Sequence, residues 1–332
     1  MRRFWLCFVA LLCASCAPTL SASPVAHRVA ATPEPTGAAS VTVSFATPKP
    51  APPKVLAVGP VVRPKPPASA DLSSFHNLGT WVDVFDYTND PSTILPLVAQ
   101  MPGLGVKTLY LETARSNSTG DIAYPASLAA ALDAAKARGL HVVAWYPPDF
   151  TNVALDVRRS LAAINFRTAH GNTFDAFASD IEYTQGVPDA AVRSARTIQY
   201  SQTLRADAGK TYPLGGIVIP PTSLQINPQR WPNFPWHALG PLYDVFMPMN
   251  YWTAHARTAA TAADLTERND ALTRALTGKP VHNIGGLAAD ADPGQIAAYV
   301  QAAMSSGSLG GGLYDFKTTG SNLWSVLRRF NT

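Results

Sequence analysis

The stretch FDAFASDIEY, Phe174 to Tyr183, has the pattern of a buried strand that ends in two carboxylates. Side chains alternate along a strand, so residues two positions apart point to the same face. The residues that would share one face here are Ala176, Ala178, Asp180 and Glu182. Two adjacent acids cost free energy unless they have partners or a use. In a barrel of parallel strands, active sites lie at the C-terminal strand ends, where this acidic pair would lie.

The sequence from Gly79 onward alternates between apolar strand-like runs and helical stretches. The predicted strands are Thr80–Tyr87, Val106–Glu112, His141–Pro147, Phe174–Tyr183, Tyr212–Pro220, Tyr243–Trp252, Pro280–Gly286 and Gly310–Phe316. The predicted helices are Pro91–Gln100, the stretch from Ser127 to a cap at Gly139, Val153–Arg167, Pro188–Ala208, His237–Leu239, Ala260–Leu276, Pro293–Ser305 and Leu323–Phe330. Eight such pairs over roughly 250 residues predict an α/β fold of the (β/α)8 TIM-barrel class. The alternative, an open doubly wound sheet, is disfavoured because the glycines at 310–312 precede a strand instead of following one as a phosphate loop.

The chain is predicted to have three parts. Residues 1–22 resemble a signal peptide, because Arg2 and Arg3 precede the short apolar run Phe4–Leu12. Residues 23–75 are rich in Pro and Ala, which predicts an extended, disordered linker. Residues 76–332 form the predicted barrel. We therefore expect the protein to be secreted or held at the outer face of a bacterial cell membrane.

The segment CASC, Cys13 to Cys16, resembles a bacterial lipobox, in which the last cysteine is lipidated. Lipoboxes prefer Leu where this chain has Cys13, so cleavage near Ser15 or Ala22 without lipidation at Cys16 stays an alternative. All three cysteines, Cys7, Cys13 and Cys16, lie within residues 1–22, so the predicted barrel has no disulfide and no thiolate metal site. A lipid anchor at Cys16 is the only membrane attachment that we expect.

The formal net charge of +4 is modest, and the basic residues are scattered, which argues against a nucleic-acid partner. The histidines are scattered as well, so no metal site is assigned. No strand is followed by a dinucleotide or phosphate loop, so no cofactor is expected. We expect a monomer.

Acids, amides and aromatic residues follow the predicted strands, where a barrel would bring them together. They are Asp83, Asp86, Glu112, Tyr146, Asp149, Asp180, Glu182, Tyr183, Asn250, Tyr251, Trp252, His282, Asn283, Asp315 and Lys317. This mixture suits a sugar, because polar groups bond its hydroxyls and aromatic rings stack on its C–H faces. Structural roles compete with this interpretation: Asp83 could pair with a basic residue, Glu112 could cap a loop and Trp252 could pack in the core.

The chain resembles the family 18 glycoside hydrolases, the chitinase-like barrels, in two motifs. Their fourth strand carries Asp-x-x-Asp-x-Asp-x-Glu, which Asp175, Asp180 and Glu182 match, with Ala178 in place of the second Asp. Their sixth strand carries Met-x-Tyr-Asp, which Met249 to Trp252 matches apart from the final Trp. The chain also resembles a group of exported bacterial barrel proteins described as glycoside hydrolases, from which no residue roles carry over.

The resemblance implies three catalytic residues. Glu182 would be the general acid, Asp180 would orient the N-acetyl group of the substrate, and Tyr251 would bond that group. Ala178 removes the acid with which Asp180 would share a proton, which leaves open a route with two carboxylates. The second carboxylate would then be Glu112, Asp86 or Asp315. The residues expected to bind substrate are Asp86, Glu112, Tyr146, Tyr183, Asn250, Trp252 and Asp315.

These observations predict an exported glycoside hydrolase that cleaves an extracellular or cell-envelope polysaccharide. A non-catalytic carbohydrate-binding barrel is the alternative, because chitinase-like folds without the full set of acids act as lectins. An esterase is disfavoured because the chain has no Gly-x-Ser-x-Gly motif.

Overall fold

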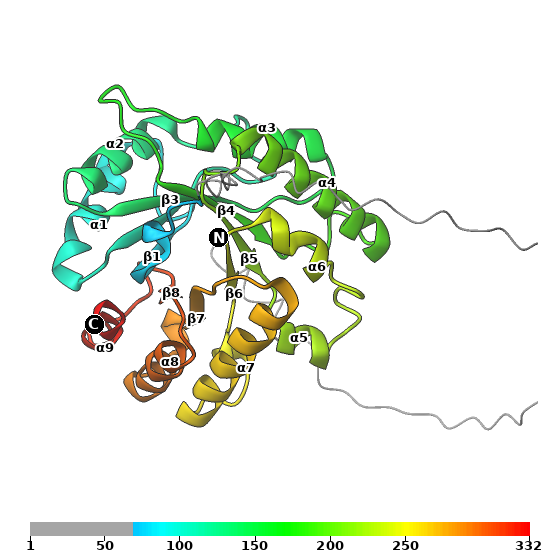
Figure 1. Cartoon of the computed structure of the whole chain (residues 1–332). Coiled ribbons are helices and arrows are strands. Elements are labelled where there is room, and N and C mark those ends of the chain that lie inside the picture. Colours follow the sequence, from blue (N-terminus) through cyan, green and yellow to red (C-terminus); the bar gives the residue numbers. More distant parts are fainter. Residues whose placement is uncertain (1–68) are drawn as a thin grey trace, which may run out of the picture. The chain divides into compact units, whose positions relative to one another are not determined.

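The structure, a computed structural model, describes residues 69–332. The predicted signal peptide, Cys16 and most of the predicted linker lie outside these residues. The described part is a ring of parallel strands surrounded by helices (Figure 1). The strands are β1 (Asn77–Val82), β2 (Thr108–Glu112), β3 (His141–Tyr146), β4 (Ala176–Ile181), β5 (Leu214–Val218), β6 (Val245–Pro248), β7 (Asn283–Leu287) and β8 (Gly310–Tyr314).

The eight strands form one sheet in the order β6-β5-β4-β3-β2-β1-β8-β7. The sheet closes between its two ends through parallel bridges that pair Phe246 with Val281 and Met249 with Ile284. The Asn250 N–H also donates a hydrogen bond of 2.7 Å to the Ile284 carbonyl across this seam. Closure confirms the (β/α)8 barrel and excludes the open doubly wound sheet.

The helices lie on the outside of the strands (Figure 1). They are α1 (Leu95–Gln100), α2 (Pro125–Lys136), α3 (Val153–Ile164), α4 (Ala190–Ala208), α5 (Pro221–Ile226), α6 (Trp236–Leu239), α7 (Ala259–Thr277), α8 (Pro293–Ser305) and α9 (Trp324–Leu327). α8 has the predicted bounds because its start is encoded locally: the Asp292 side chain accepts from the N–H groups of Gly294 and Gln295, and Pro293 opens the first turn. α5 was not predicted. Within residues 69–332 no helix has both the length and the apolar character needed to cross a membrane.

The barrel interior is asymmetric in side-chain size. Trp81, Tyr110 and Trp145 from β1, β2 and β3 pack together, with the rings of Trp81 and Tyr110 stacked at 4.2 Å between centroids. Ala176 and Ala178 of β4 face the same interior, as the alternation predicted. The small residues of β4 therefore leave room in the barrel interior for the large aromatic side chains of β1, β2 and β3.

The observed strands are shorter than the predicted ones, and the C-terminal end of β1 is displaced most. This strand ends at Val82 instead of Tyr87, because carboxylates take over the next backbone N–H groups. Val84 N–H donates to Glu112 and Phe85 N–H donates to Asp83. The chain also enters the barrel earlier than the predicted boundary at residue 76. Phe75 is fully buried in the interior, and its carbonyl lies 2.8 Å from His282 Nδ1.

Candidate functional site

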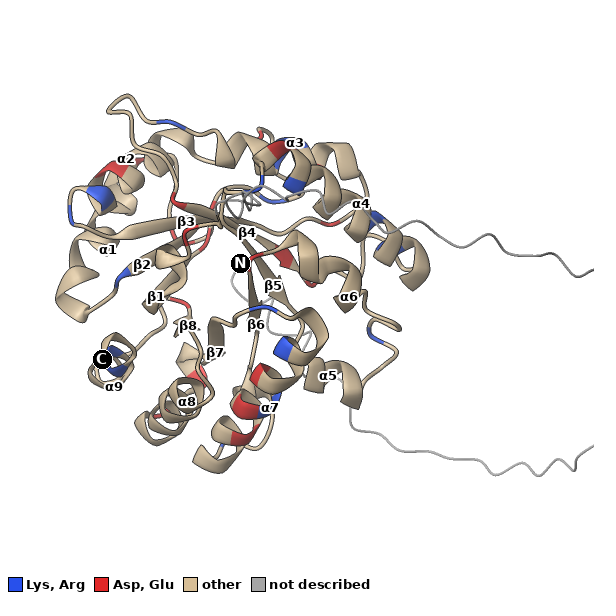
Figure 2. Ribbon diagram, in the orientation of Figure 1, with Lys and Arg blue, Asp and Glu red and all other residues tan. Residues whose placement is uncertain are grey.

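Charged and phenolic side chains from five strands come together at the C-terminal ends of the barrel strands. Figure 2 shows acidic and basic residues near the strand ends as well as on outer helices such as α3 and α7. The groups that follow the strands and influence one another electrostatically are Asp83, Asp86, Glu112, Arg115, Asp180, Glu182, Tyr251, Tyr314, Asp315 and Lys317. Arg230, from the loop between β5 and β6, acts on the same groups. We call this set the mouth cluster.

Asp180 and Glu182, at the end of β4, form an acidic pair within the mouth cluster. Asp180 is 8% exposed, and its Oδ1 is buried with no hydrogen-bond partner within residues 69–332. Burial raises the pKa of Asp180 well above its usual value, and the charges of Glu182 and Glu112 raise it further. Burial and the neighbouring acid therefore favour the protonated form of Asp180.

Glu182 directly follows β4 and is the more accessible member of the pair, with 27% of its side chain exposed. Burial raises its pKa, while the guanidinium groups of Arg230 and Arg115 oppose the rise. Arg230 Nη2 lies 3.6 Å from Glu182 Oε2. The two carboxyls are coupled, so they titrate as a unit.

Tyr251 lies in the loop after β6, where the charges of the β4 pair act on its hydroxyl. Burial raises the pKa of its hydroxyl well above the usual value, and the charges of Glu182, Asp180 and Asp315 add to this rise. The hydroxyl therefore stays protonated and remains a hydrogen-bond donor at all ordinary pH values. Groups that follow β4, β6 and β8 therefore lie close enough to influence one another electrostatically, and Glu182, Asp180, Tyr251 and Asp315 are among them.

Glu112 is the most deeply buried acid of the mouth cluster, and its side chain is fully buried. Its Oε2 accepts from the Val84 N–H at 2.9 Å, and its Oε1 lies 3.4 Å from Arg115 Nε. Burial raises the pKa of Glu112 to about 8, although Arg115 and the Val84 N–H lower it. Glu112 is therefore largely protonated at neutral pH, and it shapes the loop after β1.

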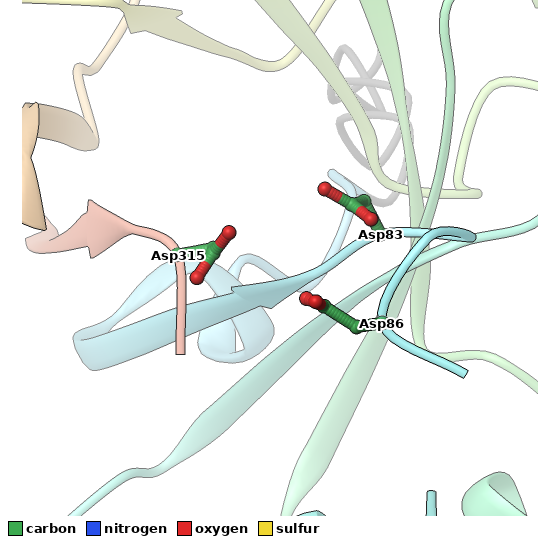
Figure 3. A group of neighbouring side chains, drawn as sticks. All are labelled: Asp83, Asp86 and Asp315. Atoms are coloured by element: carbon green, nitrogen blue, oxygen red, sulfur yellow. The ribbon is translucent and has the colours of Figure 1, made fainter. Parts of the chain in front are cut away.

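Three aspartates from the ends of β1 and β8 form the acidic edge of the mouth cluster (Figure 3). One carboxylate oxygen from each of Asp83, Asp86 and Asp315 lies within 4.8 Å of the others, a spacing that could suit a cation. Each of them also has a protein partner. Tyr314 donates to Asp83 at 2.6 Å, Thr318 donates to Asp315, and Lys317 Nζ lies 3.4 Å from Asp86. Burial, together with Asp83 and Asp315, raises the pKa of Asp86 to about 6.

Replacement of Glu112 by Gln should change how stability depends on pH. The folded protein holds the Glu112 proton more tightly than the unfolded chain, because burial raises the pKa from 4.5 to about 8. This contribution to stability is complete below pH 4.5 and is lost as the pH rises through 8. We expect the Tm of the wild type minus that of Glu112→Gln to fall between pH 5 and 8.5, as measured by calorimetry.

The exposed Glu267 on α7 supplies the control for this measurement. The Tm difference between the wild type and Glu267→Gln should not vary over the same pH range. A flat difference for Glu112→Gln would contradict the raised pKa.

Three residues expected to bind substrate are instead structural. Tyr146 points into the helix layer, where it donates a 2.6 Å hydrogen bond to Asp156 of α3. Trp252 is fully buried, donates to Gln295 and packs on Tyr299. The Asn250 side chain donates to buried Asn283. These assignments were wrong because a residue that follows a strand can turn outward as easily as into the mouth.

The other positions of the chitinase-like motif on strand four are Asp175, Ala178 and Tyr183. Tyr183 is half-buried next to Glu182. Asp175 precedes β4, at the opposite end from the mouth, and binds Lys136 and the Val142 N–H. Ala178 faces the apolar interior and pairs in register with Trp145. The family-like Asp175 is therefore a structural residue.

Arg115, Arg230 and Tyr314 were missed by the sequence analysis. Arg115 and Arg230 lie in loops without any periodic pattern, so nothing in their local sequence marks them as neighbours of Asp180 and Glu182. Tyr314 lies in a predicted strand. The alternation of side chains along that strand indicates which face of the sheet Tyr314 lies on, but it does not identify Asp83 as the acceptor of its hydroxyl.

No protein-family model matches the chain, and no curated protein matches it at a significant level. The fold is nevertheless similar to solved structures. The endo-β-1,4-mannanase from Thermotoga petrophila has a TM-score of 0.58 and 10% identity, over 77% of this chain and 76% of that one. The GH18 chitinase from Cycas revoluta in complex with (GlcNAc)3 has a TM-score of 0.53 and 11% identity, over 76% and 98%.

The glycoside hydrolase domain of PgaB (BpsB) from Bordetella bronchiseptica has a TM-score of 0.52 and 16% identity, over 76% of this chain and 98% of that one. Likeness at such low identity concerns the fold. The chain has the (β/α)8 barrel fold found in chitinase-like and other glycoside hydrolase barrels.

Proposed function

We propose that the protein is a glycoside hydrolase whose active site is the mouth cluster. The observation that carries the proposal is the coupled pair of Asp180 and Glu182 at the end of β4, with the Tyr251 hydroxyl near enough to be influenced by both charges. Protonation of a glycosidic oxygen requires a carboxyl whose pKa is raised, as burial and the neighbouring acid raise it in this pair. The chitinase-like barrel fold supports this interpretation.

Glu182 is the proposed general acid because it is the more accessible carboxyl of the pair. Its proton passes to the glycosidic oxygen as the bond from that oxygen to the anomeric carbon breaks. Water then delivers its hydroxyl to the anomeric carbon, and its proton returns to a carboxylate. Asp180, with an unpartnered Oδ1, supplies the proton reserve or accepts a hydrogen bond from the substrate.

The group that attacks the anomeric carbon follows from what surrounds each remaining acid. Glu112 is protonated at neutral pH and lies deepest, which makes it a poor nucleophile or base. Asp86 is paired with Lys317. Asp315 acts electrostatically on Tyr251 and is the better second carboxylate. An N-acetyl group of the substrate, oriented by Asp180 and Tyr251, is the other route.

A carbohydrate-binding barrel without catalysis is the second candidate. Ala178 favours it, because this position is apolar where the chitinase-like motif has an acid. In either case the proposed ligand is a polysaccharide of the cell envelope or its surroundings. Export as a secreted or Cys16-lipidated monomer is part of the same proposal and rests on the sequence of residues 1–22.

The protein should hydrolyse at least one member of a panel of aryl glycosides, chitin and mannan oligosaccharides and purified peptidoglycan. Reducing ends and released aryl groups measure the reaction, and mass spectrometry identifies the products. Binding of a glycan by the wild type without any turnover across the panel would reject the hydrolase and establish the second candidate.

A further inference from the structure

An exposed aromatic ring lies beside the mouth cluster. Phe85 is 64% exposed, the largest exposed fraction of any aromatic side chain among the large hydrophobic residues described in residues 69–332. It lies between Asp83 and Asp86, both of which belong to the mouth cluster. A single exposed apolar side chain is ordinary on a protein surface. Exposure alone therefore does not mark Phe85 as a binding residue.

The loop that carries Phe85 is held in place by hydrogen bonds that its backbone N–H groups donate. Phe85 N–H donates to Asp83 Oδ1 at 2.7 Å, and Asp86 N–H donates to the Asp83 carbonyl at 3.1 Å. Val84 is buried, and its N–H donates to Glu112 Oε2 at 2.9 Å. The loop therefore presents the ring from a fixed backbone, so little conformational entropy is lost when a ligand binds to it.

The ring also has an electrostatic neighbour that links it to the β4 pair. The guanidinium carbon of Arg115 lies 4.5 Å from the centroid of the Phe85 ring, which orients the ring. The same guanidinium lies 3.4 Å from Glu112 and lowers the pKa of both Asp180 and Glu182. Arg115 therefore contacts the Phe85 ring and also acts electrostatically on the carboxyls that we assign to catalysis.

We propose that Phe85 is a stacking platform for one pyranose ring of the glycan bound at the mouth cluster. The C–H groups of a pyranose carry partial positive charge and bind the negative face of an aromatic ring. Asp83 and Asp86, which flank Phe85 in the sequence, would supply acceptors for the hydroxyls of the same sugar. The inference rests on the proposed function in that it takes the ligand to be a glycan, but it does not require hydrolysis.

The test measures binding and turnover separately. Chitohexaose, mannohexaose and soluble peptidoglycan fragments are titrated by calorimetry into the wild type, Phe85→Ala, Phe85→Leu and Phe85→Trp. For a glycan that binds the wild type, we expect Phe85→Ala and Phe85→Leu to raise Kd about tenfold. Phe85→Trp should keep or improve the affinity, because it restores a ring. If the glycan is hydrolysed, the KM of Phe85→Ala should rise by a similar factor, with a smaller change in kcat.

Met304→Ala is the matched control. Met304 is an exposed apolar residue near the C-terminal end of α8, which leads to the opposite end of the barrel. Its removal should leave Kd and KM unchanged. Wild-type Kd in Phe85→Ala, or full affinity in Phe85→Leu, would overturn the platform. Weaker binding by Phe85→Ala in a protein that never hydrolyses the glycan would keep the platform and reject the hydrolase. Absence of binding and turnover with every glycan would reject both.

Discussion

Replacement of Glu182 by Gln should lower kcat by roughly 10²- to 10⁴-fold, the range of a lost general acid. Gln has nearly the same volume and keeps a hydrogen-bonding side chain at the end of β4, but it cannot donate a proton to a leaving oxygen. The loss should depend on the leaving group. It should be large for an unactivated disaccharide and small for a dinitrophenyl glycoside, whose leaving group departs without protonation. Initial rates on both substrates provide the measurement.

Glu267→Gln is the matched control, because it makes the same chemical change on the exposed surface of α7. It should retain wild-type rates on both substrates. Equal activity of Glu182→Gln and the wild type would remove Glu182 from the mechanism. An equal loss on both leaving groups would show that Glu182 acts in some way other than proton donation.

Replacement of Trp81 by Ala should be the most destabilising of the changes considered for the barrel. Trp81 is 2% exposed, stacks on Tyr110 and meets the edge of Trp145 in the interior. Truncation of such a residue leaves a large cavity and costs about 3–5 kcal/mol. For a domain of this size the Tm should fall by roughly 10 °C. Calorimetry and urea unfolding measure both quantities.

Trp81→Phe separates packing from hydrogen bonding at the same position. The indole N–H of Trp81 is buried without a hydrogen-bond partner within residues 69–332. Its loss removes an unpaired donor, so Trp81→Phe should cost less than about 1.5 kcal/mol. Phe85→Ala, only a few residues away but exposed, should change stability by less than about 0.5 kcal/mol. A cost below about 1 kcal/mol for Trp81→Ala would show that the interior collapses to fill the space.

The sequence was a good guide to elements whose signals are local. α8 was predicted with its observed bounds because Asp292 and Pro293 mark its start within a few residues. The ends of β1 and β6 were placed too late, since distant carboxylates and loop geometry end these strands. No local signal marks an N–H of residue 84 that bonds to a carboxylate of residue 112.

The same distinction applies to the site. Asp180 and Glu182 could be singled out from FDAFASDIEY, because two-residue alternation places both acids beyond the apolar interior face of one strand. Tyr146 and Trp252 were equally plausible from sequence but turn into the helix layer. Arg230, which lies 3.6 Å from Glu182, comes from a loop almost fifty residues away and could not be found.

The sequence alone determined the eightfold alternation of strands and helices, the interior face of β4 and the acidic pair at its end, because these depend on residue periodicity and spacing. The tertiary structure decided which groups surround that pair. Closure of the barrel brings Glu112, Tyr251, Asp315 and two arginines to the same mouth, and burial there raises the pKa of Asp180 and Glu182. Protonation depends on the surrounding charges and on the exclusion of water, which exist only after the chain has folded.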